Sequence, residues 1–306
     1  MNARFTPVPH CWVCDGDRLT PVHDATFDLH EYSTQDPPLA QYTGASIPIV
    51  RCAACGFAQP AAVPELPRYF DRMYDQRWDD EWVRAEHEGT YKDDVFADVL
   101  SGLDARLPPE RRRLLDVGAH AGRFLVAARR AGWNADGLEL NPKTGAYAAA
   151  VTGASVHQGN VHSFDADGQY DAVTLTDVLE HIPEPRTVLS RVRGFLARGG
   201  WIAIKVPHGP AQRLKERIHG IVHPGYRPTL ADNLVHVNHF TPESLERALT
   251  REGFRTITIG AGAPEMPPGR GSERLLRRLL FASARTCPGA VHTPLALNLQ
   301  AYARRD

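Results

Sequence analysis

From residue 113 onward, short apolar segments alternate with longer segments in which apolar residues recur at the helical spacing. This alternation predicts strands joined by helical crossovers, with helices on both faces of one sheet. Asn141 and Pro142 begin a helix that ends near Gly153, and Gly132 ends the helix before it. We expect a doubly wound, mostly parallel α/β fold with strands at 113–117, 135–140, 155–158, 170–178, 201–207, 255–260 and 295–305.

Two stretches interrupt this alternation. Residues 208–240 lack a regular period, and residues 261–292 are rich in Pro and Gly. Long irregular segments in an α/β domain tend to be binding loops or lids, so we treat both stretches as insertions. The other helices are expected at 185–200, which two glycines close, at 241–254, which Thr241 caps, and at 272–285.

The first part of the chain has a different pattern. Residues 1–67 are rich in Pro, Thr and Asp and contain no long periodic helix, whereas residues 68–108 have a helical pattern that ends at Pro108. We therefore predict three parts: a small module over 1–67, a helical connector over 68–108 that also covers the binding pocket, and an α/β domain over 109–306.

The composition is that of an ordinary globular protein of 306 residues, with 42% hydrophobic and 23% charged residues. Lys and Arg total 35 against 36 Asp and Glu, so no overall field attracts nucleic acid, although arginines at 111–113 and 274–285 could form local patches. No apolar run reaches the roughly 20 residues of a membrane span, and the N-terminus lacks a secretory signal pattern. We expect a cytoplasmic protein; its oligomeric state stays open.

Four of the five cysteines form two CxxC pairs, Cys11 with Cys14 and Cys52 with Cys55. In a reducing compartment such pairs favour a metal over disulfides, and four thiolates suit a tetrahedral structural zinc. Closing the loop of 37 residues between the two pairs costs little free energy, because the entropy of loop closure grows only with the logarithm of loop length. We expect the zinc to serve folding and not catalysis, since four thiolates leave no open position. The alternatives are a redox dithiol or four reduced cysteines; Cys287 is expected to be a buried thiol.

The turn "GAHAG" after the first strand has the features of a ligand-binding turn. Gly118 and Gly122 permit a tight turn, and the helix that follows points its N-terminus at the carboxyl edge of the sheet. Glu139 ends the second strand, where its carboxylate can bind the two ribose hydroxyls of a nucleoside. A dinucleotide would favour glycine at 118, 120 and 123, but the chain has His120 and Arg123.

The segments "LLDVGAHAG", "GLELN", "GNVHSF" and "YDAVTLTDVLEHI" resemble, in order, cofactor-binding motifs of the class I S-adenosyl-L-methionine (SAM)-dependent methyltransferases. The segment "HVNHFTPESLERALTREGF" resembles the small-molecule subgroup, which includes ubiquinone-type and sugar methyltransferases. The resemblance covers about residues 109–306 and implies a Rossmann-like, seven-stranded sheet that binds SAM. It implies contacts with SAM from Asp116, Gly118, Ala119, His120, Gly122, Glu139, Leu140, Asn160, Val161, Thr176 and Asp177.

Two of these positions depart from the family pattern. Asn160 replaces the more usual acid, and its side chain can still hydrogen-bond the adenine amino group. His120 replaces the usual glycine, and its side chain either points away from the methionine part of the cofactor or fills the cofactor pocket.

The cysteine arrangement resembles the zinc-binding N-terminal module of a group of sugar and natural-product methyltransferases. Members that act on nucleotide sugars are typically longer and carry a further C-terminal domain, which makes a sugar nucleotide a less expected acceptor.

His181 is the candidate general base, because an imidazole with a pKa near neutrality can take a proton from the acceptor. The alternative is that it only hydrogen-bonds the loop and shapes the pocket. His236 and His239 could face one pocket, although their spacing is not a metal signature. Candidate aromatic walls, or packing residues between the parts of the chain, are Tyr74, Trp78 and Tyr91.

We therefore expect SAM-dependent methylation of a small-molecule acceptor, such as a natural product, sugar or related metabolite. Oxygen or carbon is favoured over nitrogen, because the Asn/Asp-Pro-Pro-aromatic turn typical of amino acceptors is absent after the fourth strand. The alternatives are a zinc-containing RNA-base methyltransferase and a non-enzymatic scaffold.

Overall fold

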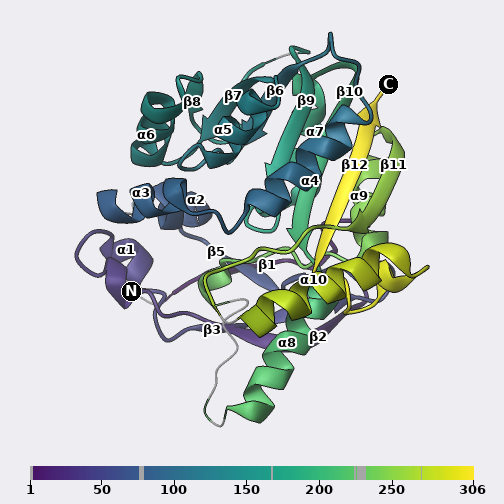
Figure 1. Ribbon diagram of the computed structural model, residues 1–306. Helices are drawn as coiled ribbons and strands as arrows, with labels where there is room; N and C mark the ends of the chain where they lie inside the picture. The colour runs from purple at the N-terminus through teal and green to yellow at the C-terminus, as the bar shows by residue number, and fades with distance from the viewer. Residues whose placement is uncertain (1–2, 76–78, 167, 224, 226–231, 270) are drawn as a thin grey trace.

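A computed structural model describes residues 3–75, 79–166, 168–223, 225, 232–269 and 271–306 (Figure 1). Within these residues the centre is a seven-stranded sheet with the order β11-β12-β10-β9-β6-β7-β8. The strands from β10 to β8 are mutually parallel, and β12 runs antiparallel to both of its neighbours. The predicted fold is confirmed. Its strands are β6 (Arg113–Val117), β7 (Asn134–Glu139), β8 (Val156–Gln158), β9 (Tyr170–Thr176), β10 (Leu196–Pro207), β11 (Phe254–Ala261) and β12 (Asn298–Arg305).

Successive residues of the central strands face opposite sides of this sheet. Leu115 and Ile202 pack into a core shared with α7 and α9, whereas their neighbours Leu114 and Ala203 pack into a core shared with α4 and α5. Both faces are therefore covered, which explains why these strands are almost continuously apolar. The helices of this part are α4 (Asp93–Asp104), α5 (Arg123–Arg130), α6 (Pro142–Thr152), α7 (Pro185–Phe195), α8 (Gly209–Val222), α9 (Pro242–Arg251) and α10 (Gly271–Thr286).

The two predicted helix caps are confirmed. Asn141 accepts hydrogen bonds from the backbone N–H groups of Lys143 and Thr144, at 2.9 and 3.2 Å. Thr241 accepts from the N–H of Ser244, whose hydroxyl in turn accepts from the N–H of Thr241. These reciprocal bonds satisfy donors at the first turn that have no partner inside the helix.

The N-terminal residues form two small antiparallel sheets, with the orders β1-β5 and β2-β3-β4. A cluster of edge-to-face aromatic rings fills the space beside them, with Phe5 and Phe27 both near Tyr42, and Phe27 6.1 Å from Tyr69. The elements are β1 (Phe5–Pro7), β2 (Leu19–Thr26), α1 (Pro37–Ala40), β3 (Ser46–Cys52), β4 (Ala58–Pro60) and β5 (Ala62–Pro64), with 3-10 turns along the chain at His30–Tyr32, Asp232–Leu234 and Ala290–His292.

The described residues between the N-terminal sheets and the large sheet form the helices α2 (Tyr69–Asp75), α3 (Asp80–Glu88) and then α4. Figure 1 shows α2 and α3 between the carboxyl ends of β6 to β9 and the N-terminal module. Tyr69, which is 2% exposed, inserts the start of α2 into the aromatic cluster of the module. The module therefore fixes where α2 lies against the large sheet.

The helix expected over 185–200 is shorter than predicted. The helix α7 ends at Phe195, and β10 begins at once, with Leu196 paired to Tyr170 of β9 and an irregular register before Trp201. Gly199 has φ +70°, and a Cβ on Gly200 would lie 2.9 Å from a backbone oxygen. The two glycines therefore form a bulge in a strand and do not terminate a helix.

Residues 208–240 are less irregular than expected, because they contain the 14-residue helix α8. Cys287 is exposed, so the expectation of a buried thiol is wrong. The boundaries of the three predicted parts stay predictions. None of the helices in the described ranges is long and apolar enough to cross a membrane.

Replacing Gly102 with alanine is expected to destabilise the fold by about 1–3 kcal/mol, the usual cost of overpacking. A Cβ at this position of α4 would lie 1.9 Å from the hydroxyl oxygen of Tyr302 on β12. Gly194→Ala in α7 is the matched control, since a Cβ added there would have no described atom within 4 Å beyond its own helix and chain neighbours. Urea unfolding should show a lower midpoint for the first variant only; equal midpoints would contradict this packing.

Candidate functional site

A cavity of about 930 Å³ opens at the carboxyl edge of the large sheet, between the strand ends and the helices α2 and α3. It lies where the chain reverses strand order, because β6 has β7 on one side and β9 on the other. Such switch points bind ligands in open α/β sheets. The volume is near the upper end of the roughly 300–1,000 Å³ typical of small-molecule sites.

Eleven of the twelve residues predicted to bind the cofactor or act in catalysis line this cavity, and Gly122 does not. A Cβ on Gly122 would lie 2.9 Å from side-chain atoms of both Ala148 and Thr152, so this glycine lets α5 approach α6. Gly118 has φ +76°, and its N–H donates to the Leu138 carbonyl at 2.8 Å. The lining residues are Asp116, Gly118, Ala119, His120, Glu139, Leu140, Asn160, Val161, Thr176, Asp177 and His181.

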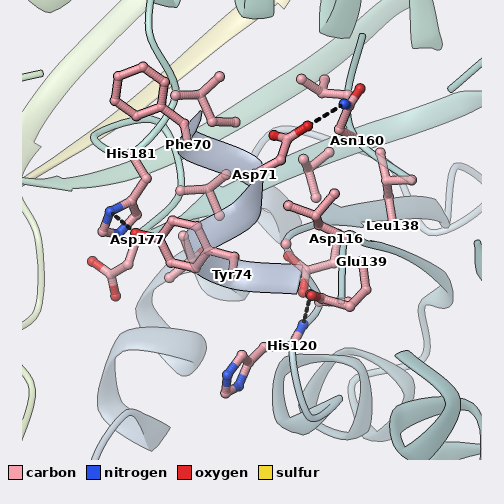
Figure 2. Close-up of a pocket in the computed structure, with 18 of the residues that line it drawn as sticks. Phe70, Asp71, Tyr74, Asp116, His120, Leu138, Glu139, Asn160, Asp177 and His181 are labelled. Carbon is pink, nitrogen blue, oxygen red and sulfur yellow. Dashed lines mark hydrogen bonds between the residues drawn. The ribbon is translucent and has the colours of Figure 1, made fainter. Parts of the chain in front are cut away.

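Glu139 is buried at the end of β7, and backbone groups hold both of its carboxylate oxygens. The N–H of His120 donates to Oε2 at 2.6 Å, and the N–H of Asn141 donates to Oε1 at 2.9 Å (Figure 2). Burial raises the pKa of Glu139, and these hydrogen bonds oppose that shift. Hydrogen bonds from the Thr144 side chain and from the Leu140 backbone oppose the shift as well.

The backbone of His120 joins the turn to Glu139, while its side chain lies apart from that carboxylate (Figure 2). The ring packs edge-to-face on Trp82 of α3, with the centroids 5.0 Å apart. Burial lowers the pKa of His120 to about 4, so the ring is neutral near pH 7. Its φ of +49° is unusual for a residue with a side chain. Its role toward a cofactor stays a prediction.

Two acids behave differently at the centre of the cavity. Asp116 accepts a hydrogen bond from the Thr174 hydroxyl at 2.6 Å, and burial raises its pKa to about 7. Asp177 pairs with the ammonium groups of Lys92, at 2.9 Å, and of Lys205. Burial opposes ionisation of Asp177, but these two cations hold its pKa well below the usual range.

His181 lies near Asp177, in the loop after β9 (Figure 2). Its Nδ1 lies 2.6 Å from the carbonyl oxygen of Val235 and 2.9 Å from the hydroxyl of Tyr74. A ring nitrogen facing a carbonyl must carry the proton, which leaves the lone pair on Nε2. Burial lowers the pKa of His181, so the ring is neutral at pH 7. Nε2 lies 3.9 Å from Oε1 of Glu180. A neutral ring with a lone pair on Nε2 suits a proton acceptor.

The histidines at 236 and 239 lie apart. The ring of His236 packs edge-to-face against His181, with the centroids 4.8 Å apart, whereas His239 lies near His23 of β2. His181, His236 and Glu180 place one ligand atom each within 4.8 Å of one another, so they could hold a metal ion. Burial, together with Asp177, raises the pKa of Glu180 to about 8, which favours its protonated form at pH 7.

The four N-terminal cysteines come together as the sequence suggests. Their sulfur atoms all lie within 4.8 Å of one another, with the closest pairs at 3.6 Å (Cys11 and Cys55) and 3.4 Å (Cys14 and Cys52). Tetrahedral zinc with Zn–S bonds of about 2.3 Å requires sulfur–sulfur separations of about 3.8 Å. The donor set and its spacing therefore fit a zinc ion, which these four residues would hold.

Several residues at the cavity were not identified from the sequence. Lys92, Trp82 and Asp71 line it, and Lys205 reaches Asp177 from the middle of β10. Of these residues, only Lys205 could have been identified from the sequence, because it is the one charged residue in the apolar strand "WIAIKVP". Among the candidate aromatic walls, Tyr74 and Tyr91 line the cavity, and Trp78 lies outside the described residues.

A family model described as "Methyltransferase domain" matches residues 91–259, just over half of the chain. A ubiquinone biosynthesis O-methyltransferase of Thiobacillus denitrificans is 30% identical over 110 residues, 34% of this chain and 47% of that protein. A trans-aconitate 2-methyltransferase of a Mycobacterium species is 30% identical over 142 residues, 44% of this chain and 53% of that protein. The chain thus spans about half the length of the curated relatives it matches.

Among solved structures, a chain from a complex that contains the Haloferax volcanii Trm112 methyltransferase activator aligns with 77% of this chain and 96% of its own length. The TM-score is 0.53 and the sequence identity is 16%, so this likeness concerns the fold.

Proposed function

This chain belongs to the SAM-dependent methyltransferase domain family, and from that premise we propose that it methylates a small-molecule acceptor at oxygen or carbon. The sequence-based expectation of a methyltransferase is confirmed at the level of the family.

The observation that carries the proposal is the position of Glu139. Its buried carboxylate lines a cavity at the strand switch point, beside a turn in which two glycines have left-handed backbone conformations. These features suit a nucleoside whose ribose hydroxyls donate to Glu139. Val161 and Leu140 supply apolar contacts for the base, and the turn from Gly118 to His120 borders the amino-acid end.

When SAM is bound, its sulfonium supplies an electrophilic methyl group. The chain contributes by orienting the acceptor and by excluding water, since α2 and α3 cover the carboxyl edge (Figure 1). Nε2 of the neutral His181 accepts the proton that a hydroxyl or carbon acceptor releases. Val235 and Tyr74 keep the ring oriented through Nδ1.

A small acceptor is supported by the shape of the site and by the charge of the chain. The cavity is bounded by helices and by Val235, and the formal net charge is −1. The names of the two curated relatives refer to ubiquinone biosynthesis and to trans-aconitate, both of which concern small molecules. The first of these names specifies an oxygen acceptor, which favours oxygen here.

The test is transfer of label from methyl-tritiated SAM to a panel that contains catechols, polycarboxylic acids and transfer RNA. We expect S-adenosylhomocysteine to be released with at least one small acceptor. We expect no release that depends on RNA. Transfer to RNA alone, suppressed by salt, would replace it with the RNA-base alternative. If the protein binds no SAM, the non-enzymatic scaffold would replace the proposed function.

Replacing Glu139 with glutamine is expected to weaken S-adenosylhomocysteine binding about 10- to 100-fold, because hydrogen bonds to a charged group contribute roughly 1.5–3 kcal/mol. Isothermal titration calorimetry measures this change. Glu246→Gln on the exposed face of α9 is the control and should bind normally. Unchanged affinity in the Glu139 variant would remove this residue from the ribose site.

We also propose that Cys11, Cys14, Cys52 and Cys55 hold one structural zinc ion per chain. Support comes from the sulfur geometry and from the packing of the knuckles. Cys11, Cys52 and Phe57 share one core with residues of α7 and α9. Asp15, beside the first knuckle, pairs with Arg186 of α7 and Arg251 of α9.

A further inference from the structure

The side chain of Asn160, which lines the cavity, already makes three hydrogen bonds within the protein. Its Oδ1 accepts from the backbone N–H groups of His162 and Ser163, both at 3.0 Å. Its Nδ2 donates to Oδ2 of Asp71 at 3.1 Å (Figure 2). An amide oxygen has two lone pairs, so two N–H donors use its capacity. Asn160 therefore has no acceptor left for an adenine amino group.

Asp71 has the acceptor that Asn160 lacks. It lines the same cavity from α2, and Figure 2 shows its carboxylate directed at Asn160. Within the described residues, its contacts with Asn160 and with Arg68, at 3.4 Å, both use Oδ2. Oδ1 is then the oxygen that can accept from a ligand. The guanidinium of Arg68 and the side-chain amide of Asn160 lie beside this partly buried carboxyl group.

We propose that Asp71, and not Asn160, recognises the 6-amino group of the cofactor's adenine, while Asn160 orients Asp71. This inference rests on the proposed function, because it assigns a residue within the SAM site. Asp71 of α2 would thereby supply the carboxylate that is absent at position 160 after β8. Asp71 lies outside the residues 91–259 that match the methyltransferase family.

The position of Asp71 is fixed from both sides of α2. At the start of the helix, Tyr69 packs against Phe27 and Tyr42 in the N-terminal module. At its end, the carbonyl of Tyr74 accepts from Nδ2 of Asn141 at 2.7 Å, in the loop next to Glu139. The helix is thus bonded to the loops after β7 and β8, which flank the base and the ribose. The N-terminal module therefore takes part in cofactor recognition through α2.

The proposal has a chemical consequence for base preference. A carboxylate accepts a hydrogen bond from the 6-amino group of adenine but repels the 6-oxo group of hypoxanthine. An amide at the same position can donate to the 6-oxo group. Asp71→Asn should therefore shift the preference of the site from adenine toward hypoxanthine, which a purely structural role of Asp71 would not do.

The experiment is calorimetric titration of the full chain with S-adenosylhomocysteine and with S-inosylhomocysteine. The unmodified protein should bind the adenosyl compound at least tenfold more tightly. In Asp71→Asn the adenosyl affinity should fall about tenfold, and the ratio of the two affinities should move at least tenfold toward the inosyl compound. Asp80→Asn, an exposed residue of α3 that pairs with Lys143, is the matched control and should keep the original ratio.

Each result is decisive once thermal melts show that the variants are folded. Normal adenosyl binding with an unchanged ratio in Asp71→Asn would overturn the role of Asp71 and leave the proposed function intact. Absence of binding by the unmodified protein would overturn both. If Asp71→Asn fails to fold, Asn160→Ala gives the same test through loss of orientation. Asn160→Ala should lower the affinity for S-adenosylhomocysteine and reduce the ratio of the adenosyl to the inosyl affinity. An unchanged ratio in this variant would overturn the proposal.

Discussion

Replacing Cys52 with serine is expected to remove the zinc ion from the protein and most of its folding stability with it. Structural zinc contributes roughly 10–16 kcal/mol in small zinc peptides near pH 7, and three thiolates retain only part of that. Here the effect should extend to the large sheet, because Cys52 is 2% exposed in a core that also contains residues of α7 and α9. Whole-protein stability is typically only about 5–15 kcal/mol.

The measurement combines metal analysis by plasma mass spectrometry with thermal unfolding. The unmodified chain should carry one zinc per molecule, and Cys52→Ser should carry almost none and unfold at a much lower temperature. Cys287→Ser provides the matched control, because this exposed thiol lies outside the cluster and should change neither value. A metal-free native protein whose stability is the same in Cys52→Ser would show that the cysteines are ordinary core residues.

Replacing His181 with asparagine is expected to lower kcat by about 10²- to 10⁴-fold with a hydroxyl acceptor, the usual contribution of a general base. Binding of S-adenosylhomocysteine should stay within about twofold, because the ring acts on the acceptor and not on the nucleoside. The exposed His292 offers the control substitution to asparagine. If kcat changes less than threefold, His181 serves only to shape the loop.

The pH dependence gives a second readout for His181. A base must be unprotonated, and burial lowers the pKa of this imidazole from its ordinary value of 6.5. Activity should therefore be full at pH 7 and fall only as the pH drops below 6.5, through the lowered pKa. This acid limb should disappear in His181→Asn, whose residual rate has no such proton acceptor. An acid limb of unchanged position in the variant would assign it to another group.

The fold could be predicted because its signals are local. Apolar strands, the cap at Asn141 and the cap at Thr241 each depend on residues within a few positions, and each is present as expected. The helix α8 also carried such signals, with Pro210 in its first turn and apolar residues at 214, 218 and 221. This helix was not identified from the sequence, because a histidine and a glycine interrupt the apolar pattern. The apolar face is largely exposed in the structure.

The site could be predicted only where its residues follow strands of the large sheet. Carboxyl ends of parallel strands meet at one edge, so Gly118, Glu139 and Asp177 could be brought together from their order along the chain. Lys92 reaches Asp177 across 85 residues, and Asp71 reaches Asn160 across 89. Such pairs depend on how the connector packs on the sheet, and periodicity carries no information about that.

The most direct test of the central claim is a crystal structure of the full chain with S-adenosylhomocysteine. We expect the nucleoside in the cavity at the carboxyl edge of the sheet, with both ribose hydroxyls within hydrogen-bond distance of Glu139. A nucleoside found elsewhere, or a ribose that makes no contact with Glu139, would contradict it.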